Sequence, residues 1–174
     1  MLVKFFNHAR KSKADSGTMP RQARVVSLHI ASYGAAPMQS VTTVTAVAGR
    51  GIVGDRYFTQ SGTYSNHPGN GRAVTLIEIE AIEALARECD VHLAAGTVRR
   101  NLVTHGVALN DFIGKTFTVG AVVLHGTRLC EPCWHLEKLA GKGVARGLIH
   151  RGGLRAEIVS GGSVQVGDAI AVVD

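Results

Sequence analysis

The sequence predicts an α+β fold that is mainly β, a small β-barrel with a few peripheral helices. Three observations support this fold class. Short runs rich in β-branched residues recur along the chain and are bounded by glycine-containing turns. Glycine contributes 21 residues, whereas aromatic residues make up only 5% of the chain, a composition typical of turn-rich β architectures. Proline is nearly absent from the runs, so they can lie inside a sheet.

The predicted strands follow one another along most of the chain. The alternating run at 25–30 predicts the first strand, and the valine-rich run at 41–47 predicts the second, after a loop at 33–39. A long polar loop at 59–71 follows, and a loop of this length in a compact domain is usually functional or mobile. The later predicted strands span residues 117–119, 121–124, 155–159, 164–166 and 169–173.

One helix is predicted over residues 75–89. Thr75 and Glu78 have the spacing of a capping box, which marks a helix start. Apolar residues then recur at intervals of three and four, at Ile79, Ile82, Leu85, Ala86 and Cys89. This periodicity places Cys89 on the buried face of the helix as an ordinary core thiol.

Charge and length divide the chain into two parts. Residues 1–22 are predicted to be a flexible basic N-terminal extension, and residues 23–174 are predicted to be one domain. Most of the net charge of +6 lies in the first 24 residues, so the body of the domain is almost neutral and nucleic-acid binding is not expected. No run approaches the ~18 apolar residues that span a membrane. Three cysteines without a secretory signal indicate a reducing, cytoplasmic location.

The segment 128–137 carries the chemistry-bearing pattern of the sequence. Cys130 and Cys133 are three residues apart, after a strand-like run and before a predicted helical turn. A helix start and a neighbouring arginine, here Arg128, favour the thiolate form, which is a strong nucleophile and a soft metal ligand. The sequence therefore predicts chemistry that runs through sulfur, with Cys133 and Cys130 as candidate catalytic residues.

Four interpretations of this cysteine pair are open. In the first interpretation, the thiols are structural and buried, although the polar residues around them do not favour burial. In the second interpretation, the thiols belong to a zinc site, although the nearby histidines supply no second ligand pair. In the third interpretation, the thiols form a thioredoxin-like dithiol, although the surrounding sequence pattern is not that of a βαβ unit. Alternatively, one thiolate carries sulfur or ligates a cofactor metal such as the molybdenum of the pterin cofactor, a soft centre.

The phosphate of that cofactor requires arginines and backbone amides. The sequence has arginines in turn-like positions at Arg56, Arg72, Arg99, Arg128, Arg151 and Arg155. Arg151 also stands beside Gly152 and Gly153, a combination that predicts anion binding by a side chain together with exposed amides.

Several segments recur in a specific order and spacing: residues 51–56, 72–78, 99–103, 130–133, 150–155 and 167–168, together with Gly120. On these segments, over residues 24–171, the chain resembles stand-alone MOSC-domain proteins, a family named after the C-terminal part of molybdenum cofactor sulfurase. The resemblance implies a small β-barrel with peripheral helices, and Cys133 as the residue that binds molybdenum or sulfur. It also implies that Arg56, Arg99 and Asn101 hold the pterin (molybdopterin) and its phosphate.

The resemblance implies two functions. Family members reduce small N-hydroxylated substrates with a cysteine-bound molybdenum cofactor, or are proposed to carry sulfur as a persulfide received from a pyridoxal-phosphate-dependent cysteine desulfurase. Longer reductase relatives carry further domains that this sequence lacks, so we expect electrons to come from a separate electron-donor protein. Either function requires Cys133 to be reachable from solvent in a hollow that attracts anions. A non-catalytic binding barrel is a third, weaker hypothesis.

Overall fold

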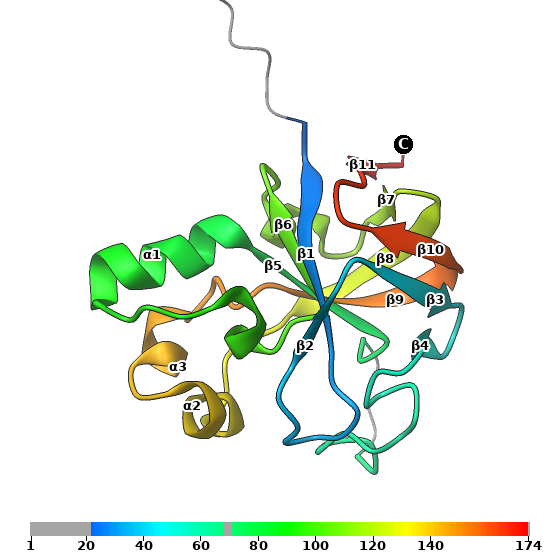
Figure 1. Cartoon of the computed structure of the whole chain (residues 1–174). Coiled ribbons are helices and arrows are strands. Elements are labelled where there is room, and N and C mark those ends of the chain that lie inside the picture. The colour runs from blue at the N-terminus through cyan, green and yellow to red at the C-terminus, as the bar shows by residue number, and fades with distance from the viewer. Residues whose placement is uncertain (1–21, 68–70, 174) are drawn as a thin grey trace, which may run out of the picture.

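The strands of the protein form two hydrogen-bonded sheets, with the helices gathered on one side of them (Figure 1). The computed structural model describes residues 22–67 and 71–173. The predicted N-terminal extension therefore lies, except for Gln22, outside the described residues. The described part is mostly β with few helices, as predicted.

The larger sheet has eight strands in the order β11-β7-β8-β9-β5-β6-β1-β2. All neighbouring strands are antiparallel except β5 and β6, which are parallel. The strands are β1 (Arg24–Ile30), β2 (Gln39–Val41), β5 (Val74–Glu78), β6 (Leu102–His105), β7 (Thr116–Val119), β8 (Val122–Leu129), β9 (Leu154–Ser160) and β11 (Ile170–Val172).

The smaller sheet consists of β10 (Gly162–Gln165), β3 (Thr43–Val47) and β4 (Gly51–Ile52), in that order. The strand predicted over 41–47 is thus divided at Thr42, where the chain passes from the larger sheet to the smaller one. A single bridge between Arg24 and Ala169 connects β1 to the segment before β11. The ladders of the described strands nevertheless form two sheets, so the predicted closed barrel is not confirmed.

Two hydrophobic clusters form the core. The larger one lies between the sheets and includes the fully buried Leu28, Phe117 and Leu124. The other fills the space between the larger sheet and the helices, where Ile77 and Val103 pack against the helix residues. The helices are α1 (Ile79–Cys89), α2 (Trp134–Ala140) and α3 (Val144–Gly147), with short 3₁₀ turns η1 (Ala95–Val98) and η2 (Leu109–Phe112).

The predicted start of the long helix is wrong. Residues 75–78 belong to β5, and α1 begins only at Ile79. Thr75 does not cap the helix, because its hydroxyl donates to the side chain of Asn101, directly before β6. The run Val74–Glu78 is a central strand that is buried almost throughout, as expected for a strand with neighbours on both sides and a helix layer over it.

The predicted burial of Cys89 is also wrong, because this thiol is exposed. The apolar face of α1 is buried at Ala81, Ile82, Ala84 and Leu85. Cys89 is the last residue of the helix, and Asp90 ends it in the left-handed conformation. The periodicity therefore continues beyond the point where the core ends.

Strand β8 is longer than predicted and brings the chain to the cysteine pair. It continues from Val122 through Gly126 to Leu129. A Cβ atom at Gly126 would overlap the backbone carbonyl of Phe112, so glycine here permits a close approach of two backbones. Among the described residues, no helix is both long and apolar enough to cross a lipid bilayer.

Candidate functional site

Cys130 is held firmly at the end of β8. Its backbone N–H donates to the carbonyl of Gly153 at 2.7 Å, and its own carbonyl accepts a hydrogen bond from Arg100 at 2.8 Å. The side chain is only 2% exposed. Cys130 is therefore a buried thiol that fixes the start of the cysteine segment.

Cys133 is placed differently, at the N-cap of α2. Its backbone is extended, and its carbonyl accepts the first helical hydrogen bond from Glu137 at 3.1 Å. Because the N-cap residue stands at the edge of the helix, its side chain is exposed to solvent. Both cysteines are free thiols, and Cys133 alone of the two is accessible to a reactant.

The loop predicted from its length to be functional reaches Cys133. The hydroxyl of Tyr64 lies 3.9 Å from the sulfur of Cys133, and Thr63 contacts the Nε2 atom of His135 at 3.2 Å. Desolvation, followed by the hydrogen bond with Cys133, raises the pKa of Tyr64, so its hydroxyl stays protonated at neutral pH and is able to donate to a thiolate at Cys133. The positive charge of Arg155 acts in the opposite direction on that pKa.

A small cavity of about 60 Å³ borders Cys133, and we call it the Cys133 hollow. Its walls come from seven parts of the sequence that the fold brings together. It is lined by Gly34, Arg56, Tyr57, Thr63, Tyr64, Thr75, Arg99, Arg100, Cys130, Cys133, His135, Leu136 and Arg155. The hollow thus combines an accessible thiol with four guanidinium groups.

In the described part of the chain, the side chains of Arg99 and Arg100 donate only to neutral carbonyls. Arg99 donates to Ala36 at 2.8 Å and to Gly34 at 2.7 Å. Arg100 is buried and donates to the backbone oxygens of Gly152, Val98 and Cys130. Burial, followed by repulsion from Arg56, lowers the pKa of Arg99, which is the effect expected where positive charges crowd together.

Arg155 has the least satisfied guanidinium of the hollow. Its Nε atom is buried and has no hydrogen-bond partner among the described residues. A buried donor without an acceptor costs about 1–3 kcal/mol and is rare in native proteins. An anionic oxygen or a sulfur atom in the hollow would supply the missing acceptor.

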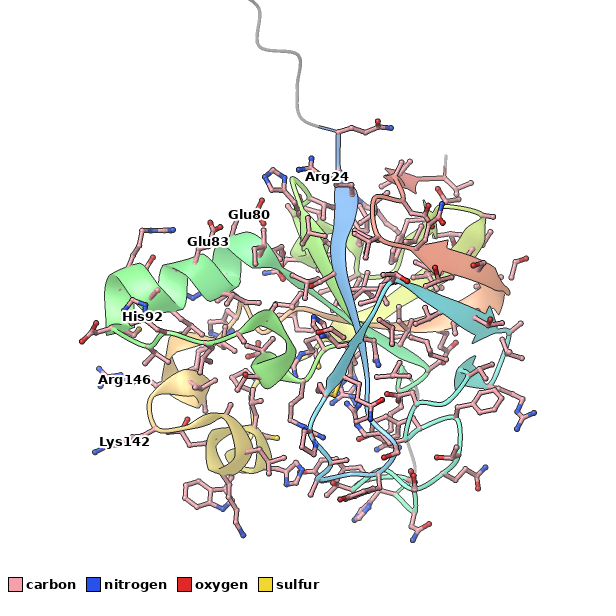
Figure 2. The ribbon with its side chains drawn as sticks, in the orientation of Figure 1. Arg24, Glu80, Glu83, His92, Lys142 and Arg146 are labelled. Carbon is pink, nitrogen blue, oxygen red and sulfur yellow. The ribbon has the colours of Figure 1, made fainter. Side chains whose placement is uncertain are left out.

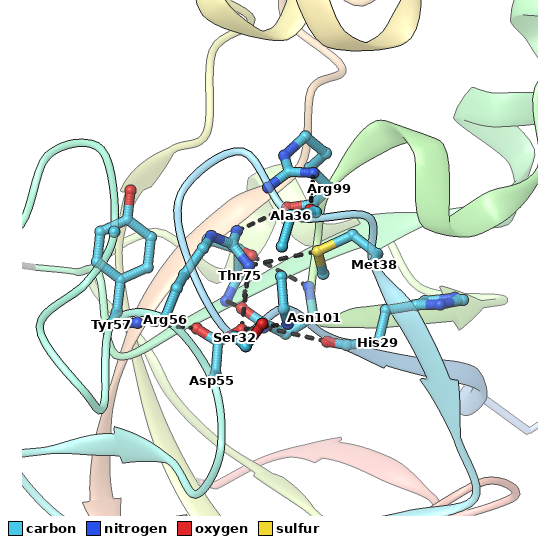
Figure 3. Close-up of polar contacts among 12 residues, drawn as sticks. His29, Ser32, Ala36, Met38, Asp55, Arg56, Tyr57, Thr75, Arg99 and Asn101 are labelled. Carbon is cyan, nitrogen blue, oxygen red and sulfur yellow. Dashed lines mark hydrogen bonds and ion pairs between the residues drawn. The ribbon is translucent and has the colours of Figure 1, made fainter.

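Within residues 22–67 and 71–173, Arg56 is the one guanidinium of the hollow that forms an ion pair. Its Nη1 atom lies 3.0 Å from Asp55, and its Nη2 atom donates to the carbonyl of Arg99 at 3.2 Å (Figure 3). The carboxylate of Asp55 also accepts hydrogen bonds from the backbone of Ala31 and Tyr57. This network fixes the turn after β4 against the Arg99 backbone.

Asn101 belongs to the same network and not to the wall of the hollow. Its amide donates to Asp55 at 3.1 Å and to the carbonyl of His29, and its oxygen accepts from the backbone and hydroxyl of Thr75 (Figure 3). All these contacts are internal. The structure thus places Asn101 behind the hollow, where it supports Arg56 through Asp55.

The remaining predicted arginines lie elsewhere. Arg151 pairs with Glu88 at 2.7 Å and donates to Gly147, which directs it towards α1. Arg128 is exposed on β8, opposite Arg155 in the strand register. Arg72 donates to the carbonyl of His67 and lines a second cavity of about 760 Å³, which adjoins the Cys133 hollow at Tyr57.

Sequence reasoning missed three residues of the site. Asp55 follows a glycine-rich turn, Tyr64 lies in the long polar loop, and Arg100 directly follows Arg99. Only the length of the loop could have directed attention to Tyr64. Within the residues that the structure describes, no three His, Cys, Asp or Glu side chains gather where they could hold a metal ion. A metal at Cys133 would therefore need further ligands from a cofactor.

Comparisons with known proteins agree with this architecture. The chain is similar to the YUAD protein from Bacillus subtilis, with 18% identity, 87% of this chain and 95% of that chain covered, and a TM-score of 0.74. It is similar to YiiM from Geobacillus stearothermophilus, with 14% identity over 87% of this chain and 75% of that chain, and a TM-score of 0.67. YiiM from Escherichia coli matches with 18% identity, 86% and 70% coverage, and a TM-score of 0.60.

These similarities show the fold. No curated protein matches the chain. The family model of the MOSC domain matches residues 63–171, which is more than half of the sequence and includes both Tyr64 and the cysteine pair. The chain therefore belongs to the MOSC domain family.

Proposed function

We propose that this MOSC-domain protein binds the molybdenum cofactor and that the Cys133 thiolate is a ligand of the metal. One observation carries the proposal. An exposed thiol opens on a hollow in which Arg99, Arg100 and Arg155 form no ion pair within the described residues. A soft sulfur ligand beside uncompensated positive charge is the donor set that suits an anionic, sulfur-ligated metal group.

The residues present fit this group chemically. The buried Nε of Arg155 lacks an acceptor, and an anionic group would satisfy it. The cavity of about 760 Å³, which shares Tyr57 with the hollow of about 60 Å³, lies within the size range of small-molecule sites. Arg50 and Arg72 line that cavity together with one acidic residue, Glu157, so cations outnumber anions there.

When bound, the group would supply redox chemistry for the reduction of an N–O bond in an N-hydroxylated compound, with electrons from a separate donor protein. The protein's own residues prepare the site. The Tyr64 hydroxyl lies within hydrogen-bond distance of the Cys133 sulfur and would donate to its thiolate, and the Asp55 network holds Arg56 and the Arg99 backbone in place. Arg100 fixes the carbonyl of Cys130 and thereby the start of the cysteine segment.

The test is metal analysis of protein purified from a molybdenum-replete host. The wild type should contain close to one molybdenum per chain. Cys133→Ser should lose it, and Cys89→Ser, which removes another exposed thiol, should retain it. Molybdenum that is absent from the wild type after reconstitution, or retained by the Cys133 variant, overturns the proposal.

A second function is favoured by the size of the hollow. About 60 Å³ accommodates a single additional sulfur atom without any rearrangement. In this alternative a cysteine desulfurase persulfide gives its outer sulfur to the Cys133 thiolate and leaves as a thiolate. Intact mass spectrometry after incubation with a desulfurase and cysteine would show the gain of one sulfur in the wild type and in Cys89→Ser, and an unchanged mass in Cys133→Ser.

A further inference from the structure

The residue next to Cys133 is the single tryptophan of the chain, and it is almost fully exposed. Trp134 opens α2 with 79% of its surface accessible to solvent. Isolated exposed apolar residues are common, but tryptophan is also the residue most enriched among those that dominate binding at protein interfaces. Its position beside the accessible thiol makes it a candidate contact for a partner that reaches Cys133.

Three exposed cations follow Trp134 in α2, in the turn after it and in α3. Lys138 lies four residues after Trp134 and so shares its face of α2. Lys142 and Arg146 are exposed in the following turn and in α3, and both side chains extend away from the body of the protein (Figure 2). Among the described residues, none of the three side chains forms a hydrogen bond or an ion pair within 4 Å.

The acidic residue nearest in sequence is committed to the backbone. The two carboxylate oxygens of Glu137 accept hydrogen bonds from the N–H groups of Gly143 and Ala145, both at 2.7 Å. These bonds lower the pKa of Glu137, with a smaller contribution from Lys142. The carboxylate thus closes the α2–α3 turn and leaves the outward-facing cations without a bonded partner.

We propose that Trp134, Lys138, Lys142 and Arg146 form a docking surface for an acidic electron-donor protein that delivers electrons to the site at Cys133. The surface combines an aromatic anchor with positive charge on its rim, which fits a partner with an apolar centre and an acidic border. Three cations in an otherwise neutral domain are too few for nucleic acid. The proposal rests on the proposed function of Cys133, because the donor is needed only for redox chemistry there.

The test measures the binding of two purified probes, an acidic [2Fe–2S] ferredoxin and an acidic flavodoxin, by isothermal titration calorimetry at about 50 mM salt. At least one probe should bind with a Kd in the micromolar range, and binding should weaken steeply at about 300 mM salt. Basic cytochrome c serves as the probe of opposite charge and should not bind.

Matched variants assign the surface. The double variant Lys138→Glu, Lys142→Glu and the single variant Trp134→Ala should each weaken binding about tenfold or more. Lys115→Glu reverses an exposed charge after η2 and should change the Kd less than twofold. Thermal unfolding of each variant establishes that it is folded.

The outcomes separate this inference from the proposed function. Three results would overturn the docking surface. The first is that neither acidic probe binds, and the second is that the double variant binds a probe as tightly as the wild type does. The third is that the wild type binds a DNA duplex and the double variant does not. Cys133→Ser should bind the probe like the wild type, because the thiol is not part of the surface. A protein that binds the probe through these residues but contains no molybdenum after reconstitution overturns only the proposed function.

Discussion

The hydroxyl of Tyr64 lies 3.9 Å from the sulfur of Cys133, although the two residues are separated by 69 positions in the sequence. The contact joins the polar loop after β4 to the N-cap of α2. It covers one side of the thiol while leaving the other side exposed. The reactivity of Cys133 should therefore depend on a residue that belongs to a different part of the chain.

Tyr64→Phe should slow the alkylation of Cys133 by iodoacetamide at neutral pH. The variant keeps the ring but removes the hydrogen bond that stabilises the reactive thiolate. A hydrogen bond of roughly 1 kcal/mol corresponds to a three- to fivefold lower rate. Tyr57→Phe is the matched control, because Tyr57 lines the same hollow without a hydrogen bond to the sulfur. Equal rates for wild type and Tyr64→Phe would contradict a role for the hydroxyl.

Arg155→Met should reduce the preference of Cys133 for an anionic reagent. The ratio of the alkylation rates with iodoacetate and with iodoacetamide measures the positive potential at the thiol. We expect this ratio to fall about three- to tenfold, corresponding to roughly 1 kcal/mol of lost attraction. Arg128→Met removes the exposed arginine opposite Arg155 in the sheet and should leave the ratio unchanged. A similar decrease of the rate ratio in both variants would contradict the assignment of the positive potential at Cys133 to Arg155.

Asp55→Asn should destabilise the folded protein strongly. The carboxylate is buried and pairs with the buried guanidinium of Arg56, so the substitution leaves an uncompensated charge in the interior. The expected loss in the free energy of unfolding is about 3–5 kcal/mol, measured by urea denaturation. Asp111→Asn, at an exposed position of η2, should cost less than about 0.5 kcal/mol. A loss below about 1 kcal/mol for Asp55→Asn would argue against the network.

Stability should fall when the pH drops below about 6.5 because of His29. Burial lowers the pKa of His29 from the ordinary value of 6.5, and its two ring nitrogens contact the hydroxyls of Ser27 and Ser40. The unfolded chain therefore binds a proton at a higher pH than the folded protein does, and stability is lost as the pH decreases through and below 6.5.

His29→Gln should flatten this pH dependence, as measured by urea denaturation between about pH 5 and pH 7.5. His92→Gln, at a largely exposed histidine, is the control and should keep the slope of the wild type. If His29→Gln retains the full slope, another group is responsible.

The sequence was sufficient to predict those features that depend on neighbouring residues. The alternating run at β1 and the short helix after Cys133 were both found at their predicted places. The helix start at Thr75 was predicted wrongly, because the spacing of a capping box also occurs in a strand and only the pairing with β6 and β9 distinguishes the two. The prediction that Cys89 is buried was wrong for a related reason, since hydrophobic periodicity does not show where the core ends.

The site itself depended on contacts between distant residues. Arg151 and Arg155 have the same chemistry and stand four residues apart, yet one pairs with Glu88 and the other lines the hollow. Their directions follow from the path of β9 and from the position of α1, neither of which is encoded in the segment itself. Tyr64 could not be identified, because nothing in the local sequence shows that its loop folds back on α2.

The most direct test of the account is peptide-resolved alkylation of protein that was purified with and without molybdenum. Iodoacetamide should label Cys133 and Cys89 in the metal-free protein and leave the buried Cys130 unlabelled. In the molybdenum-loaded protein Cys133 should be protected while Cys89 is labelled as before. Equal labelling of Cys133 in both preparations, or labelling of Cys130 before Cys133, would contradict the assignment of Cys133 as the accessible thiolate that holds the metal.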